Sequence, residues 1–236
     1  MIENNKKKSI INQGGKNMNS KLNKLFSNSK FMLITGVISA LLFVGSNVPY
    51  IFAEGYELYR LDVFIEILLA ALIIGLLIAF KKGEINIQKA LMGALLFFFF
   101  NETFTNVIYS IEFYMNGYEG YLSSIVLLSI CGVLELGIIV AHLIMQTDHE
   151  GSEKAISLSR VCTILLIIFD IVDIVRYSIN MENIYLLTNL AETFLLIMIA
   201  CMETKIQIYK KTRSDALKNG TWTTEAKNEA KKIFKI

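Results

Sequence analysis

The sequence predicts an all-α integral membrane protein with six transmembrane helices arranged as three hairpins. Apolar residues make up 54% of the 236 positions, and there is a single proline. The mean hydropathy of +0.50 is too high for an ordinary soluble domain. The apolar residues also fall into six runs, each long enough to cross about 30 Å of hydrocarbon as a helix.

Helices are expected over all six runs, because a backbone in lipid must hydrogen-bond within its own segment. The runs lack the alternating polarity of barrel strands. The predicted spans are 31–53, 62–80, 88–111, 122–145, 157–179 and 184–204. Pro49 is expected to kink or end the first helix. The chain is thus divided into a polar N-terminal tail (1–30), a six-helix bundle (31–204) and a basic C-terminal tail (205–236).

Lysine and arginine are concentrated in alternate polar segments. They gather in the N-terminal tail, in the second and fourth loops and in the C-terminal tail, whereas the other loops hold few. Cytoplasmic segments carry this excess in membrane proteins. The distribution therefore predicts a protein of the cell membrane with both termini in the cytoplasm.

The C-terminal tail is expected to contain a short second helix. Gly220 is a natural end for one helix, and Thr221-Trp222-Thr223 can begin another. Apolar residues would share one face of this helix and lysines the rest, which is typical of a helix that lies on an anionic leaflet. A tail that stays in solvent is the alternative. The basic residues are few, so no nucleic-acid partner is expected.

Carboxylates lie well inside four of the apolar runs: Glu102, Glu135, Asp170 with Asp173, and Glu192. A charge in hydrocarbon costs several kcal/mol, so such residues usually line a cavity or a polar pathway. At a rise of ~1.5 Å per residue, these acids fall in the outer half of the membrane. The inner half is expected to be almost purely apolar. The pattern predicts a cavity that opens to the outside.

Neutral polar residues extend this predicted site. Asn101, Thr105, Asn106 and Tyr109 form a polar stripe with Glu102 at spacings of three and four and are expected to add contacts, while Arg176 would tune the carboxylates. An excess of acids favours a cation, which could be a proton, a metal ion or an organic amine. His142 shares a helical face with Glu135, and the two could admit a transition metal. No cofactor can be assigned.

Two other interpretations of the polar residues remain open. The buried acids could be protonated or hydrogen-bonded groups that join helices. The equal spacing of Asn47 to Glu66 and of Asp173 to Glu192 allows a repeat of the hairpins. Enzyme chemistry is not expected, because the chain has no HExxH, GxSxG or glycine-rich phosphate loop. Cys131, Cys162 and Cys201 are expected to be packing residues.

The sequence thus favours a transport protein that captures a cation or small cationic solute from outside. Six helices with an outward-facing site resemble, in overall shape, the substrate-binding components of energy-coupling-factor vitamin transporters, which would imply an ATPase as partner. The alternative is a membrane sensor or assembly subunit that acts through a cytoplasmic signalling partner. In both cases the lipid bilayer surrounds the bundle.

Overall fold

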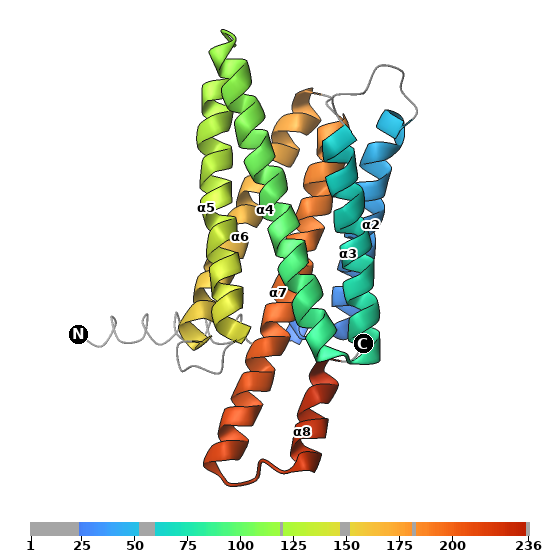
Figure 1. Cartoon of the computed structure of the whole chain (residues 1–236), viewed down its shortest axis with the longest axis vertical. Helices are drawn as coiled ribbons and strands as arrows, with labels where there is room; N and C mark the ends of the chain where they lie inside the picture. Colours follow the sequence, from blue (N-terminus) through green and yellow to red (C-terminus); the bar gives the residue numbers. More distant parts are fainter. Residues whose placement is uncertain (1–23, 52–59, 119, 147–151, 181–182, 235–236) are drawn as a thin grey trace, which may run out of the picture.

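The computed structural model describes residues 24–51, 60–118, 120–146, 152–180 and 183–234. Six long helices form a bundle (Figure 1), and within this part of the chain there is no strand. They are α2 (Ser29–Ile51), α3 (Arg60–Lys82), α4 (Ile85–Met115), α5 (Tyr121–Gln146), α6 (Ser152–Asn180) and α7 (Asn183–Lys218). Each is long and apolar enough to cross a membrane. The predicted class, an all-α protein with six such helices, is confirmed.

Each helix packs against its neighbours in sequence, and α7 closes the ring by packing against α2. Consecutive helices run in opposite directions (Figure 1). The contacts continue from α3 to α4 and from α5 to α6, so the structure does not set three hairpins apart. That division, and the repeat that would follow from it, remain predictions.

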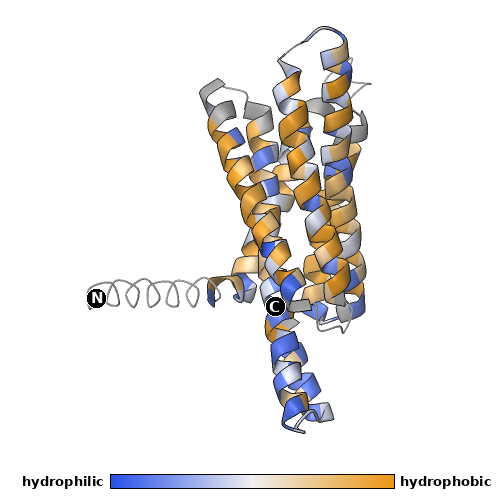
Figure 2. Ribbon diagram, turned by 90° about the vertical axis from the view of Figure 1, so that its left-hand side faces the viewer, coloured by the Kyte–Doolittle hydropathy of each residue, from blue (hydrophilic) through white to orange (hydrophobic). Residues whose placement is uncertain are grey.

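The helices bury one side and expose apolar side chains on the other. Buried residues of all six helices, including Phe43, Leu69 and Leu195, form one core. The outward sides are also apolar, as in Leu41 and Val133, which are about two-thirds exposed. The bundle is coloured mainly as hydrophobic in Figure 2. Exposed apolar side chains all round a bundle are what a hydrocarbon environment requires.

The closure of the ring depends on a glycine. A Cβ atom at Gly36 of α2 would lie 2.7 Å from the Met198 sulfur of α7 and 3.1 Å from a methyl group of Leu77. One helical turn further along α2, the Ser39 hydroxyl donates a hydrogen bond of 2.7 Å to the Ala191 carbonyl of α7. Small residues at a contact let two helices approach closely, and here they hold α2 against α7.

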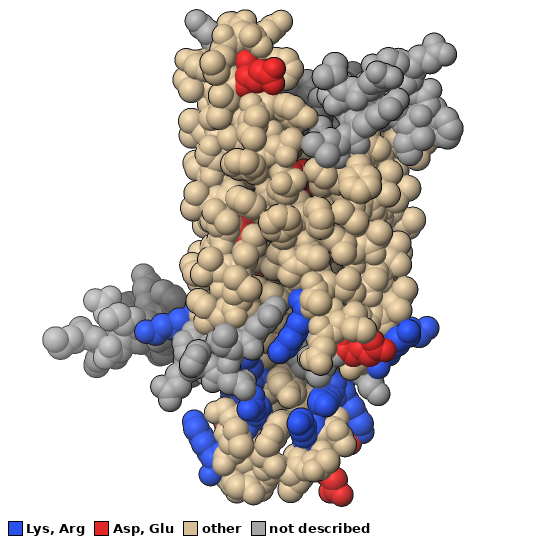
Figure 3. Space-filling view, viewed as in Figure 1, with Lys and Arg blue, Asp and Glu red and all other residues tan. Residues whose placement is uncertain are grey.

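Lysine and arginine side chains gather at one end of the bundle, as Figure 3 shows. We call this the basic end. It is the end at which α3 and α5 stop, at which α4 and α6 begin, and beyond which α7 projects (Figure 1). The side chains come from segments far apart in sequence, including Lys30, Lys82, Lys89, Lys154, Lys211 and Lys218. The opposite end has few described positive charges.

Beyond the basic end, α7 continues into a polar projection, where α8 (Thr224–Lys231) and the 3-10 turn η2 (Lys232–Phe234) fold back against it. Helix α7 ends at Lys218, and Gly220, two residues later, has a φ of +66° that turns the chain. Thr223 then caps α8 by accepting a hydrogen bond of 3.2 Å from the Ala226 amide. The predicted break at Gly220 and restart at Thr223 are confirmed.

The apolar face of α8 is directed at α7. Trp222 meets Tyr209 edge to face at a centroid distance of 6.4 Å, and Ala230 is buried. The Nζ of Lys205, which is 2% exposed, donates hydrogen bonds to Ser29 of α2 (2.7 Å) and to the Ile233 carbonyl (2.9 Å). Since α7 covers the face expected to lie on the leaflet, the predicted leaflet-bound helix gains no support.

Other predictions about the chain are partly tested. The three cysteines are free, with Cys162 and Cys201 buried, as packing residues would be. Helix α2 continues past Pro49 to Ile51, the last described residue before 60, so whether the helix ends near the proline lies outside the described residues. Most of the predicted N-terminal tail, 1–23, lies outside the described residues.

We expect Gly36→Leu to destabilise the bundle by about 1–3 kcal/mol, because the new side chain must displace Met198 and Leu77 from a packed contact. The measurement is the midpoint of thermal unfolding of the purified protein in detergent. Gly45→Leu on the same helix is the matched control, because a Cβ at Gly45 meets nothing within 4 Å. Equal midpoints for the two variants would contradict the assignment of Gly36 to the α2–α7 contact.

Candidate functional site

Five carboxyl groups from five helices are in electrostatic contact through one of them, Glu192, in the half of the bundle away from the basic end. Glu192 of α7 interacts electrostatically with four others, and its neighbours are all acids: Glu66, Glu102, Glu135 and Asp170. We call these five residues the acid layer. Helices α3, α4, α5, α6 and α7 contribute one residue each, so the ring itself brings together acids that are more than a hundred residues apart.

Glu135 is the best-defined member of the acid layer. It is 4% exposed, and its Oε1 accepts a hydrogen bond of 2.7 Å from the Thr103 hydroxyl of α4. Its Oε2 is buried and has no hydrogen-bond partner in the described structure. A buried polar atom without a partner costs about 1–3 kcal/mol, and native proteins retain few such atoms. Glu135 therefore has one oxygen available to a ligand.

Asp170 links α6 to α7. Its carboxyl group is buried, and the single proton of the Thr193 hydroxyl is shared between Oδ2 of Asp170 at 3.3 Å and the Asn189 carbonyl at 2.9 Å. Asp173, one turn further along α6, is half-buried and interacts electrostatically with Asp170. Glu192 itself is half-buried.

Glu66 is held by α2. Its Oε2 accepts hydrogen bonds from the Ser46 hydroxyl at 2.9 Å and from the Asn47 amide at 2.6 Å. Both α2 side chains are buried. Two neutral donors satisfy one carboxylate oxygen, and these hydrogen bonds join α2 to α3. Ser46 was not expected to contribute.

The stripe predicted on α4 is only partly buried. Glu102 is buried beside Thr103, whereas Asn101 and Tyr109 are half-buried and Asn106 is exposed. The Thr105 hydroxyl donates to the Asn101 carbonyl one turn back, at 2.8 Å. Thr103, which the sequence analysis missed, makes the contact with Glu135 instead. The side chain of Arg176 lies outside the described part of the structure, so its predicted role is untested.

A metal centre finds no support among the described residues, where no three His, Cys, Asp or Glu side chains come close enough to hold a metal ion. His142 and Glu135 are seven residues apart on α5, which separates them by about 10 Å along the helix. Such a separation is too long for both to bind one ion directly. His142 is 4% exposed, and neither ring nitrogen has a hydrogen-bond partner in the described structure.

A second buried polar group lies near the basic end, where the sequence analysis expected an almost purely apolar inner half. That expectation is wrong. Glu203 of α7 is fully buried and accepts a hydrogen bond from the Ser159 hydroxyl of α6. Thr163, one turn from Ser159, is also fully buried. The sequence analysis missed these residues for two reasons. Glu203 falls at the edge of an apolar run, where an acid normally marks the end of the span. Ser159 and Thr163 barely lower the hydropathy of the run that contains them.

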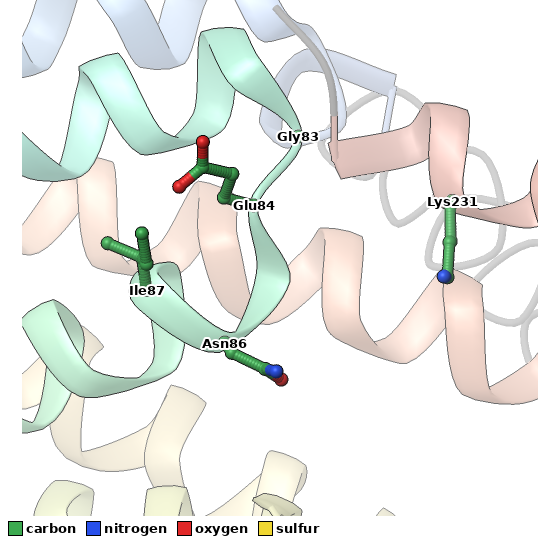
Figure 4. Close-up of a pocket in the computed structure, with 5 residues that line it drawn as sticks. All are labelled: Gly83, Glu84, Asn86, Ile87 and Lys231. Atoms are coloured by element: carbon green, nitrogen blue, oxygen red, sulfur yellow. The ribbon is translucent and has the colours of Figure 1, made fainter.

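The structure also has an open pocket of about 360 Å³ at the basic end. It lies where the turn between α3 and α4 faces α8, and its lining is drawn in Figure 4: Gly83, Glu84, Asn86, Ile87 and Lys231. The chemistry of this pocket is mixed, with one acid, one base and one amide. It is remote from the acid layer and is a separate feature of the surface.

Comparisons with protein-family models, with curated proteins and with solved structures find no match to this chain. The resemblance in shape to the vitamin-transporter components therefore gains no support. What the chain does has to be inferred from its own residues.

We expect Thr103→Val to destabilise the protein by about 1–3 kcal/mol, because it removes the donor to Glu135 and leaves both carboxyl oxygens unpaired. Thermal unfolding in detergent measures the change. Thr105→Val is the matched control on the same helix, since the Thr105 hydroxyl bonds only the backbone of its own helix. A loss at Thr105 as large as that at Thr103 would count against the Thr103–Glu135 contact.

Proposed function

We propose that this chain is a multi-pass membrane transport protein whose acid layer captures a cation or a small cationic solute. The observation that carries the proposal is the electrostatic neighbourhood of Glu192, which consists of four other carboxyl groups. Like charges that face one another between apolar helices are unfavourable unless a proton or cation compensates them. The unpaired Oε2 of Glu135 offers a free acceptor in the same place.

The spacing of the acids favours an organic cation or protons over a single chelated metal ion. The carboxyl groups lie within electrostatic range of one another, yet no three form a metal-sized group among the described residues. A larger cation can contact several carboxylates at once. The polar partners Thr103 and Thr193 would orient the carboxylates rather than bind the cation themselves.

The orientation follows from the charges. Cytoplasmic segments carry the excess of lysine and arginine, so the basic end of Figure 3 would face the cytoplasm of a cell membrane. Both chain ends would then be cytoplasmic. The acid layer would lie in the outer half of the bilayer, where it can receive its cation from outside.

We expect one class of cation to raise the thermal stability of the detergent-purified protein in a screen of organic amines, cationic vitamins, metal ions and pH. A ligand that binds only the folded state stabilises it by about 2.7 kcal/mol at a hundredfold excess over its dissociation constant. The shift should disappear in Glu135→Gln and in Glu192→Gln, because each removes a charge from the acid layer.

The matched control is Glu112→Gln, which removes an exposed carboxylate near the end of α4 and should retain the full shift. If no compound in the screen stabilises the protein while the glutamine variants fold normally, the acid layer joins helices and does not bind a cation. That result would reject the transport proposal.

A second candidate is a membrane sensor or assembly subunit, and the observation that favours it is the projection formed by α7 and α8. This pair extends beyond the basic end. Lys205 of α7 connects it to the bundle, because its ammonium group bonds both the Ile233 carbonyl of η2 and Ser29 at the start of α2. Such an element could carry a signal between the bundle and a cytoplasmic partner, either an ATPase or a signalling protein.

For a sensor or assembly subunit, we expect Trp222→Ala to abolish co-purification of the partner from native membranes, because it removes the ring that seats α8 on Tyr209. For an independent transport protein, the same variant should keep the full cation-dependent shift. Deletion of 212–236 is a harsher form of the test, since it also removes the Ile233 carbonyl that Lys205 bonds.

A further inference from the structure

We propose that Glu203, Ser159 and Thr163 form a second cation site, at the basic end, which takes one monovalent cation, a proton or Na⁺. The three side chains come from α6 and α7, and each is fully buried. The Ser159 hydroxyl donates to Oε1 of Glu203. Ser159 and Thr163 are four residues apart, so they share one face of α6.

Two oxygens at this place lack partners. Oε2 of Glu203 and Oγ1 of Thr163 are buried and make no hydrogen bond within the described structure. Cys162, the neighbour of Thr163, interacts electrostatically with Glu203, which places this turn of α6 beside the carboxyl group. One unpaired carboxylate oxygen and one unpaired hydroxyl supply two oxygen ligands of the kind that a hard cation prefers.

Charge balance selects a monovalent cation. One carboxylate and one proton or Na⁺ sum to zero, which is the least costly state in an apolar interior, whereas a divalent ion would leave a net positive charge. The nearest positive group on α6 is Arg160, which interacts electrostatically with Glu203 while its Nη2 donates to the Thr204 hydroxyl at 3.1 Å. Arg160 is only half-buried, so solvent screens part of its charge, and its guanidinium bonds neither of the two unpaired oxygens.

The remaining charges near Glu203 are already engaged. Lys205, on the same helix, directs its ammonium group to Ser29 of α2 and to the Ile233 carbonyl of η2. On α6, Cys162 is the other titratable neighbour besides Arg160. His142 of α5 interacts electrostatically with Lys89 and Lys210.

Helical spacing aligns the second site with the acid layer. Glu192 and Glu203 are eleven residues apart on α7, and Ser159 and Asp170 are eleven apart on α6. Eleven residues complete three turns, so each pair lies on one face, about 16 Å apart along the axis. Buried apolar side chains occupy the turns between them: Leu166 on α6, and Leu195 and Ile199 on α7.

Two polar layers separated by an apolar one are the arrangement of a gated pathway. If the acid layer captures a cation as proposed above, the second site is where that cation, or one exchanged for it, would be held on the cytoplasmic side. This role in transport rests on the proposed function, whereas the binding of a monovalent cation at Glu203 is independent of it.

The test for Na⁺ is thermal unfolding of the full chain in detergent, with Na⁺ titrated against Cs⁺ at constant ionic strength. If the site takes Na⁺, the unfolding midpoint rises with Na⁺, and the rise is lost in Glu203→Gln. Thr163→Val should raise the half-saturating concentration roughly three- to tenfold, as expected for one lost oxygen. Thr212→Val, at an exposed threonine on α7, is the control and should leave it unchanged.

The test for a proton is infrared spectroscopy of the carbonyl band of protonated carboxylic acids, followed across the neutral pH range. If the site takes a proton, the difference between the native protein and Glu203→Gln contains a band that titrates, and Thr163→Val shifts its midpoint. Should Glu203→Gln fail to fold, Thr163→Val and Ser159→Ala carry both tests, since each keeps the carboxyl group.

The proposal is overturned if Na⁺ has no effect on unfolding and the difference band does not titrate, or if the two hydroxyl variants change neither response. Glu192→Gln separates this outcome from failure of the proposed function. A Glu203 response that persists when the acid layer binds nothing rejects the transport proposal alone. An acid layer that binds a cation while Glu203 responds to neither Na⁺ nor pH rejects only the second site.

Discussion

The rest of the structure depends on the burial of carboxyl groups between helices whose other surfaces are apolar. Each helix needs only apolar side chains to lie in lipid, yet five of the six place an acid on the face that meets its neighbours. The acids require donors, and donors come from adjacent helices: Thr103 for Glu135, Thr193 for Asp170, and Asn47 for Glu66. These bonds join α4 to α5, α6 to α7, and α2 to α3, so the groups that form the candidate site also fix the order of the ring.

Helix α7 takes part in the closure of the ring, in both buried polar layers and in the contact with α8. It closes the ring against α2 through Ala191 and Met198, and the same stretch holds Glu192. It then carries Glu203, and beyond the bundle Lys205 and Tyr209 hold the returning α8. A displacement of α7 along its axis would therefore alter both polar layers and the polar projection together.

The sequence was sufficient for the six helices, because a run of some twenty apolar residues has one stable form in a bilayer. It also found Glu102, Glu135, Asp170 and Glu192, since a carboxylate inside such a run stands out. It could not find Thr103 or Ser46, because a hydroxyl hardly changes hydropathy and its partner lies on another helix. It placed Asn106 in the site by spacing alone, whereas that side chain is exposed. Helical periodicity identifies a face but not which neighbour covers it.

Glu203 shows why the site could not be completed from the sequence. An acid eleven residues beyond Glu192, next to Lys205, is read naturally as the start of a cytoplasmic tail, because charged residues mark the ends of spans. The helix does not end there: α6 covers Glu203 through Ser159, while Ser29 at the start of α2 and Ile233 of η2 cover Lys205, so both residues are buried. Depth in a membrane protein is set by what surrounds a residue as well as by its position along a span. The polar layer at the basic end is a product of the tertiary fold, because the hydroxyl groups that meet Glu203 of α7 come from another helix, α6.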